Sequence, residues 1–359
     1  MKTFEEIFTD KTKYGVKVQT SEYGKRGKYI IIDQGQSQIA GYTDREEGVF
    51  EELPVIVFGD HTRTIKYVDK PFFLGADGVK VLRSKDSNAN YKYLYYALKS
   101  AKIPDIGYNR HFKWLKKIQI NYPDNNRQEE IVQILDKVSD IIKNRESELS
   151  ALDELIKARF VEMFGDPVAN PKGLIKKTLP ELGEFGRGVS KHRPRNDEAL
   201  LGGPYPLIQT GDVANSGLYI TEYHSTYSEL GLQQSKMWDE GTLCITIAAN
   251  IAKTAILGFD ACFPDSIVGF IANEDTNNVF VHYWFSFFQE ILESQAPESA
   301  QKNINLKILS ELKVIVPNIQ EQNEFADFVV QVEKTKDTIQ KSLDETQILF
   351  DSLMQKYFG

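Results

Sequence analysis

Two long segments of the chain carry apolar residues at alternating spacings of three and four, without any glycine or proline. The first runs from Gln128 to Phe164, and the second follows Pro317 and ends at Phe358. This spacing is typical of a long helix whose apolar seam packs against another helix. At ~1.5 Å per residue, the first segment predicts a helix of roughly 55 Å. The predicted seam positions are Leu135, Val138, Ile142, Leu149, Leu152, Ile156, Val329, Val332, Ile339, Leu343, Phe350 and Leu353.

Neither helix can cover such a stripe alone, so we expect the two helices to pack on each other as an antiparallel coiled coil. The alternative is that each helix lies on its own globular domain. Four polar residues interrupt the seam: Arg145, Arg159, Lys336 and Thr346. Polar seam residues can fix the register of a coiled coil, and acidic neighbours across the seam would support this role here.

The two helical segments are copies of each other. A shift of 194 residues places Phe164-Gly165 on Phe358-Gly359 and Pro123 on Pro317, in a gapless register of about 57 residues. We therefore interpret the chain as a tandem duplication.

Each helical segment follows a stretch rich in Tyr, Ile, Val, Gly and Thr, which predicts short strands and turns. Short helices are expected at 91–101 and 282–294. The predicted fold is α+β, with two mixed α/β globular domains separated by the two long helices in a tandem repeat with pseudo-two-fold symmetry. The predicted division is a first domain at 1–122, a first helix at 123–166, a linker and second domain at 167–316, and a second helix at 317–359.

Charge is unevenly distributed along the chain. The formal net charge is −8, yet residues 1–122 carry 21 Lys+Arg against 15 Asp+Glu. Residues 167–316 carry 12 against 17, and both helical segments are acidic. If this protein holds DNA tightly, we expect another subunit to supply much of the positive charge. The two cysteines exclude a disulfide framework and a four-thiolate zinc site, and no apolar run approaches the ~18–20 residues of a membrane span. We expect a cytoplasmic protein.

Signatures of catalysis are missing from the sequence. It has no phosphate loop, no dinucleotide fingerprint, no H-E-x-x-H, no G-x-S-x-G and no Asn/Asp-Pro-Pro-aromatic motif of amino-methyltransferases. The five histidines are scattered, with none at metal-ligand spacing. We predict no catalytic and no metal site. A DNA-acting enzyme with an unrecognised active site, or a structural coiled-coil adaptor between proteins, are the alternatives.

Polar and basic loops are the strongest functional signal. Arg and Lys pair with phosphates or guanine, while Asn and Gln suit adenine edges. A solvated surface loop is the alternative for each segment, and a turn or capping role is the alternative for Asn109 and Asn303. The candidate DNA-binding residues of the first domain are Lys25, Arg26, Lys28, Gln34, Gln36, His61, Arg63, Asn109, Arg110 and His111. Those of the second domain are Arg187, Lys191, His192, Arg193, Arg195, Gln209, Thr210, Asn250, Lys253, Lys302 and Asn303.

The stretch "NNRQEEIVQILDKVSD…FVEMFGDPVANPKG" resembles the central conserved region of specificity subunits of type I restriction-modification systems. "PNIQEQNEF…SLMQKYFG" is similar to the distal copy of that region. "GRGVSKHRPRND…PYPLIQTGDV…SAQKNINLKIL" and "KYIIIDQGQSQIAGYTD" resemble target recognition domains. The resemblance covers essentially the whole chain.

This resemblance implies a non-catalytic protein that recognises double-stranded DNA. In that family each recognition domain reads one half of a split, asymmetric site through the major groove, and the two conserved helices set the gap. The helices also dock two modification (methyltransferase) subunits, and the full complex adds restriction (translocase/nuclease) subunits. No cofactor is implied for this chain, because S-adenosylmethionine, ATP and magnesium would belong to those partners.

Overall fold

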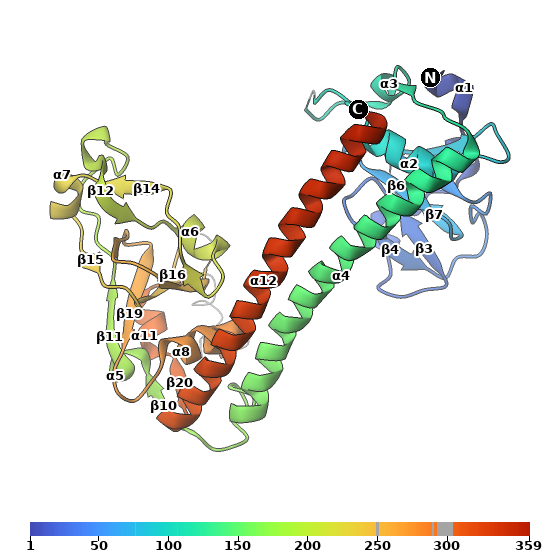
Figure 1. Ribbon diagram of the computed structural model, residues 1–359. Helices are drawn as coiled ribbons and strands as arrows, with labels where there is room; N and C mark the ends of the chain where they lie inside the picture. The colour runs from blue at the N-terminus through green and yellow to red at the C-terminus, as the bar shows by residue number, and fades with distance from the viewer. Residues whose placement is uncertain (76, 106, 249–250, 289–290, 293–303) are drawn as a thin grey trace. The chain divides into compact units, whose positions relative to one another are not determined.

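The computed structural model describes residues 1–359 except 76, 106, 249–250, 289–290 and 293–303. The chain forms two compact units (Figure 1). Unit 1 comprises residues 1–146 and 342–359, and unit 2 comprises residues 147–341. The long helices α4 (Asn125–Phe164) and α12 (Ile319–Phe358) each contribute residues to both units.

Unit 1 is built on two small sheets and a two-stranded pair. A four-stranded antiparallel sheet has the order β2-β8-β5-β6, a three-stranded sheet has the order β4-β3-β7, and β1 pairs with β9. The run Val55–Gly59 forms β5 and is buried at every position, because Ile56 and Phe58 join one core cluster while Val55 and Val57 join another. The elements are β1 (Lys2–Thr3), α1 (Phe4–Ile7), β2 (Phe8–Asp10), β3 (Tyr29–Ile32), β4 (Gly41–Thr43), β5 (Val55–Gly59), β6 (Ile65–Val68), β7 (Phe72–Leu74), β8 (Val79–Ser84), α2 (Tyr91–Lys99), α3 (Phe112–Leu115) and β9 (Gln119–Ile120).

Unit 2 has the same general plan with larger sheets. A five-stranded sheet has the order β11-β19-β16-β17-β13, a four-stranded sheet has the order β14-β12-β18-β15, and β10 pairs with β20. Its elements are β10 (Ile175–Thr178), α5 (Leu179–Leu182), β11 (Gly183–Arg187), β12 (Leu201–Leu207), α6 (Thr210–Asn215), β13 (Tyr219–Ile220), β14 (Ser225–Tyr227), α7 (Glu229–Gln233), β15 (Met237–Trp238), β16 (Leu243–Thr246), β17 (Thr254–Leu257), β18 (Ala261–Cys262), β19 (Ile267–Ala272), α8 (Asn278–Trp284), α11 (Leu306–Glu311) and β20 (Lys313–Val316).

A second repeat, which sequence analysis missed, marks the start of each globular domain. Thr3 pairs with Gln119, and Thr178 pairs with Lys313, which lies 194 residues after Gln119. Both threonines begin a short helix with a capping box, in which Glu6 or Glu181 bonds back to the threonine. Thr3 and Thr178 are thus offset by 175 residues, so no single shift along the sequence matches both ends of the globular domains.

The two long helices pack on each other through their seams. In unit 2, Asp153 of α4 lies beside Lys336 of α12, and Phe160 lies beside Phe325 further toward the start of α12, so the helices run antiparallel. In unit 1, Arg127 at the start of α4 lies over the ring of Tyr357 at the end of α12. All twelve predicted seam residues are buried or half-buried, which confirms the predicted seam.

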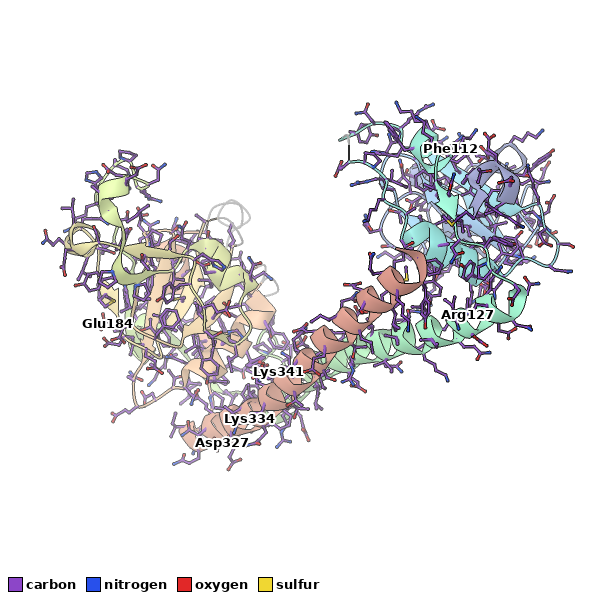
Figure 2. The ribbon with its side chains drawn as sticks, turned by 45° about the horizontal axis from the view of Figure 1, so that its top comes forward. Phe112, Arg127, Glu184, Asp327, Lys334 and Lys341 are labelled. Atoms are coloured by element: carbon purple, nitrogen blue, oxygen red, sulfur yellow. The ribbon has the colours of Figure 1, made fainter. Side chains whose placement is uncertain are left out.

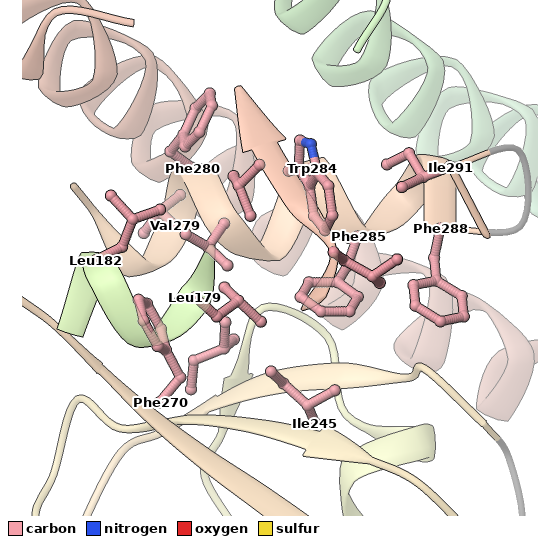
Figure 3. Packing of buried hydrophobic residues seen from close by; sticks show 14 of the residues in the cluster. Leu179, Leu182, Ile245, Phe270, Val279, Phe280, Trp284, Phe285, Phe288 and Ile291 are labelled. Atoms are coloured by element: carbon pink, nitrogen blue, oxygen red, sulfur yellow. The ribbon is translucent and has the colours of Figure 1, made fainter. Parts of the chain in front are cut away.

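Each globular domain also packs on the helix pair. In unit 2, Phe160 and Phe164 join a core formed by α5, α8 and the central sheet, part of which Figure 3 shows. In unit 1, Leu135 and Phe350 join the core of β5, β8 and α2. The expected packing of the helices on each other is therefore confirmed. The alternative, in which each helix lies on a domain of its own, is not found, because each helix packs on both domains.

Lys336 supplies the cross-seam ion pair expected for a polar seam residue. Its ammonium lies 2.7 Å from a carboxylate oxygen of Asp153 on α4 and 2.9 Å from Glu333 on its own helix. Burial lowers the pKa of Lys336, but hydrogen bonds to these two carboxylates outweigh that effect and leave its pKa raised. The pair therefore links the two helices at one register.

We expect a double-mutant cycle on Lys336→Ala and Asp153→Ala to give a coupling energy of about 0.5–1 kcal/mol in urea unfolding. Lys336 is mostly buried, so its pairing with Asp153 is less screened than a surface pair. The matched control is Lys157 with Glu154, an exposed pair within α4. Equal coupling for the two pairs would show that Lys336 does not fix the helix register.

The predicted short helices are confirmed with adjusted bounds. The helix expected at 91–101 is α2, and the one expected at 282–294 begins earlier, as α8, because Asn277 accepts a hydrogen bond from Val279 N at the helix start. Residues 289–290 and 293–294 of that prediction lie outside the described residues. The second domain also contains α6 immediately after β12, where the sequence indicated only strands and turns.

Candidate nucleic-acid interface

Three loops of unit 1 meet at Gln34. Its side-chain amide donates to the carbonyl of Asp77 at 3.1 Å, and its side-chain oxygen accepts from His61 N at 3.2 Å. The Thr62 hydroxyl donates to the Gln34 carbonyl at 2.5 Å. These hydrogen bonds join the loop after β3 to the turns after β5 and β7. Gln34 therefore has a structural role in addition to being a candidate DNA contact.

The turn between β5 and β6 presents two predicted contact residues. His61 stacks on Tyr108 with ring centroids 4.7 Å apart, and Tyr108 is 86% exposed. Arg63 has a left-handed φ of 62° and reaches Asp105 at 2.7 Å. The pKa of Asp105 is lowered by the Gly107 N–H and then by the Arg63 guanidinium. Because Asp105 is well exposed, DNA phosphate can replace it as the partner of Arg63.

His111 does not face solvent, which corrects its assignment as a DNA contact. It is 1% exposed, and its Nδ1 lies 3.0 Å from the carbonyl oxygen of Asp60. The buried Asp60 carboxylate accepts from Phe112 N at 2.7 Å. His111 therefore anchors the start of α3, while its neighbours Asn109 and Arg110 are exposed.

The remaining candidates of unit 1 form two groups. Gln36 and Arg63 line one cavity of about 350 Å³. Lys25, Arg26 and Lys28 are exposed in the segment before β3, which runs beside β4 through backbone hydrogen bonds between Gly24 and Tyr42. The Lys28 ammonium lies 2.6 Å from Glu46, and this hydrogen bond raises the pKa of Lys28.

In unit 2 the structure brings Arg195, Gln209 and Thr210 together. All three line a cavity of about 310 Å³ whose wall also contains Asn196 and Tyr227. The residues come from the loop after β11 and the junction between β12 and α6. A guanidinium, an amide and a hydroxyl around one hollow are the donors and acceptors that read base edges.

The conformation of the loop that carries Arg193 and Arg195 is stabilised by Gln234 and Asp265. Gln234 Oε1 accepts the backbone N–H groups of Lys191 and His192, at 2.7 and 3.0 Å. Asp265 pairs with Arg195 and lies 3.8 Å from Arg193. Both guanidinium groups remain about half exposed, so the carboxylate holds them without burying them.

The other described candidates of unit 2 are His192, Arg187, Lys191 and Lys253. The ring of His192 lies 3.1 Å from Asp197, whose pKa is lowered first by the Ala199 N–H and then by His192. Arg187, Lys191 and Lys253 are exposed. Asn250, Lys302 and Asn303 lie outside the described residues.

Three contributors to the loops were missed at the sequence level. Tyr108 stacks on His61, Asp265 holds the two arginines, and Asn196 lines the cavity beside Arg195. Tyr108 directly precedes the candidates Asn109 and Arg110, and Asn196 directly follows Arg195, so their position in the sequence was a usable signal. Asp265 is 70 residues from Arg195 in sequence and nothing local indicates it.

The described part of the chain contains no group of three or more His, Cys, Asp and Glu side chains placed to hold a metal ion. Within the same residues, no helix is both long and apolar enough to cross a membrane.

Comparison with known proteins gives one consistent result. The family model for the type I restriction modification DNA specificity domain matches residues 2–151 and again 171–347. The specificity subunit of the type I restriction enzyme EcoR124I/EcoR124II of Escherichia coli is 26% identical over 357 residues, covering 93% of this chain and 85% of that protein. A putative type I restriction enzyme MjaX specificity subunit of Methanocaldococcus jannaschii is 22% identical over 306 residues, covering 77% and 71%.

Solved structures share the fold. The crystal structure of a type-I restriction-modification S subunit from M. genitalium superposes with a TM-score of 0.61 at 19% identity, covering 100% of this chain and 95% of that one. A chain from a study of complex assembly and conformational transition of the type I R-M system gives 0.55 at 16% identity, covering 99% and 96%.

Proposed function

Because the chain belongs to the type I restriction modification DNA specificity family, we propose that its two units each read one half of a bipartite DNA site. Unit 1 would contact DNA through the loops that meet at Gln34, and unit 2 through the Arg193–Arg195 loop and the cavity beside it. Side chains of these kinds read base edges in the major groove. The weak similarity between the two sets of loops fits two different half-sites.

The observation that carries this proposal is the double match to the DNA specificity domain. A single recognition domain would read one continuous site, whereas two domains in tandem read two. The long helices α4 and α12 join both units, so the length of their pairing would set the unread gap between the half-sites.

The same helices offer matching positions for two identical partners. Leu155 on α4 and Leu349 on α12 lie 194 residues apart and are 47% and 51% exposed. Large apolar side chains exposed at equivalent points of both copies suit a partner that binds twice. We infer that two modification subunits dock on these faces, and that restriction subunits join the full complex.

The chemistry would then reside in the partners. S-adenosylmethionine, ATP and magnesium are assigned to the modification and restriction subunits, and this chain contributes recognition of the site. Such a complex acts on cellular DNA and is expected in the cytoplasm.

Co-expression with the cognate modification subunit, followed by base-modification sequencing of host DNA, tests this function. We expect one methylated split motif that disappears when this chain is omitted. Absence of modification together with DNA cleavage by the isolated chain would favour the enzyme alternative. Assembly with partners but no sequence-dependent DNA binding would favour the adaptor alternative.

A further inference from the structure

Helices α2 and α8 occupy the same place in the two units. Both begin after an asparagine cap, Asn90 or Asn277. Three residues past the cap, Tyr93 packs on Phe358 with centroids 5.2 Å apart, and Phe280 packs on Phe164 at 5.0 Å. Phe164 and Phe358 are themselves related by the 194-residue shift, so the packing is equivalent.

A tyrosine at the same position of both helices, bonded to a carboxylate of a long helix, supports this alignment. Six residues past the cap, Tyr96 donates to Asp136 of α4 at 2.7 Å, and Tyr283 donates to Glu333 of α12 at 3.3 Å. The residues that follow can therefore be compared position by position between the units.

In the next helical turn the side chains of the two units differ greatly in size. Unit 2 has Trp284, Phe287 and Phe288 where unit 1 has Ala97, Ser100 and Ala101. In unit 2, Trp284 is fully buried and Phe287 packs on Phe160 with centroids 5.4 Å apart (Figure 3 shows Trp284 and Phe288). These aromatic rings close the end of the unit 2 core.

In unit 1 the corresponding space is open. A cavity of about 480 Å³ is lined by Ala97, Ser100 and Ala101 together with Phe350 and Met354 of α12. Met354 is the counterpart of Phe160, the residue on which Phe287 rests in unit 2. The cavity therefore lies where unit 2 places its own aromatic side chains, and the buried apolar residues Ala97, Phe350 and Met354 in its lining could contact an aromatic ring from elsewhere.

The cavity lies on the same face of α12 as the exposed side chain of Ile348. Ile348 is 70% exposed, and Asp351 and Gln355 follow it at i+3 and i+7. Residues at these spacings share one helix face, and Asp351 and Gln355 line the cavity. A partner lying on Ile348 and Leu349 would therefore reach the cavity along the same face.

We propose that the modification subunit docked on unit 1 inserts an aromatic side chain into this cavity, and that the subunit docked on unit 2 finds the equivalent space already filled by Trp284, Phe287 and Phe288. The proposal rests on the proposed function, in which two modification subunits bind the helices. It makes the two docking sites unequal although the two subunits are identical. Buried aromatic anchors of this kind carry a large share of interface energy.

Filling the cavity as unit 2 does provides the test. We would prepare Ser100→Phe with Ala101→Phe, and each single variant, in the full chain. Ser286→Phe is the matched control, because it adds the same ring at an exposed position of the corresponding segment in unit 2. Purified chains are titrated with the cognate modification subunit, and native mass spectrometry counts the subunits bound.

We expect the wild type and Ser286→Phe to bind two modification subunits. The double variant should bind the second subunit at least tenfold more weakly, and each single variant at least threefold more weakly, with melting temperatures no lower than wild type. Unchanged binding of both subunits by folded variants would overturn the proposal. A dimer of the free wild-type chain that the variants abolish would assign the cavity to a second copy and also overturn it.

Failure of the proposed function gives a different result. In that case the wild-type chain itself binds no modification subunit. If the double variant unfolds, the single variants decide, because Ser100 and Ala101 are both half-exposed at the end of α2.

Discussion

Alanine in place of both Arg193 and Arg195 removes recognition of the half-site read by unit 2 and leaves the half-site read by unit 1 intact. Both guanidinium groups are about half exposed and lie beside the Asp265 carboxylate, and Arg195 also lines the unit 2 cavity. Each good contact between an arginine and a guanine edge contributes ~1–3 kcal/mol of discrimination. Loss of two such contacts lowers specific affinity by roughly one to several orders of magnitude.

Competition binding with DNA duplexes altered in one half-site at a time measures this effect. The expected outcome is that the double variant becomes indifferent to changes in one half-site only. Lys236→Ala is the matched control, since it removes a cation that pairs with Glu184 in the same unit outside the loop. If the double variant discriminates both half-sites as the wild type does, the loop does not contact the DNA bases.

Replacing Asp265 tests whether this carboxylate positions the two arginines for DNA recognition. Its carboxylate neutralises part of the charge that the arginines would offer to DNA. Asp265→Ala is expected to increase non-specific affinity, because more free positive charge faces phosphate. Discrimination between half-sites should fall, because the arginines lose their positioning partner.

Sequence periodicity predicted the helix pair well because a seam is a local pattern. Each heptad places apolar residues on the face that packs against the other helix, and Leu135 and Val329 are both buried at such positions. The charged faces follow the same repeat, and Figure 2 marks Asp327, Lys334 and Lys341, all exposed and seven residues apart on α12.

The globular domains were predicted only in outline because their order depends on distant contacts. The parallel pairing of β3 with β7 joins residues that are about forty positions apart in the sequence, and no local sequence pattern predicts this pairing. The repeat at Thr3 and Thr178 stayed hidden because unit 2 carries additional residues between the two matched ends.

The same distinction between local patterns and distant contacts applies to the candidate site. Basic loops such as the one around Arg193 are local features and were identified from composition. The burial of His111 depends on Asp60, which is 51 residues away, so sequence analysis assigned to DNA a residue that the fold uses internally.

Insertion of one heptad into both long helices is expected to lengthen the gap in the recognised site. The insertion points are the junctions between the two units, after Glu146 in α4 and after Lys341 in α12. A whole heptad keeps the seam in register. Seven residues add ~10 Å to each helix, which corresponds to at most about 3 base pairs at ~3.4 Å per step.

Insertion into α4 alone is the matched control. It shifts the seam of one helix past that of the other and separates Asp153 from Lys336. We expect this variant to melt at a lower temperature and to lose modification altogether, whereas the double insertion retains both. Lys157→Ala, on an exposed face of α4, should leave both properties unchanged.

The most direct test of the central claim is base-modification sequencing of host DNA after co-expression of the double-insertion variant with the modification subunit. The account predicts that both half-sites stay the same while the unread gap between them grows by about 1–3 base pairs. The same half-sites at an unchanged gap, from a variant shown to be folded, would contradict it.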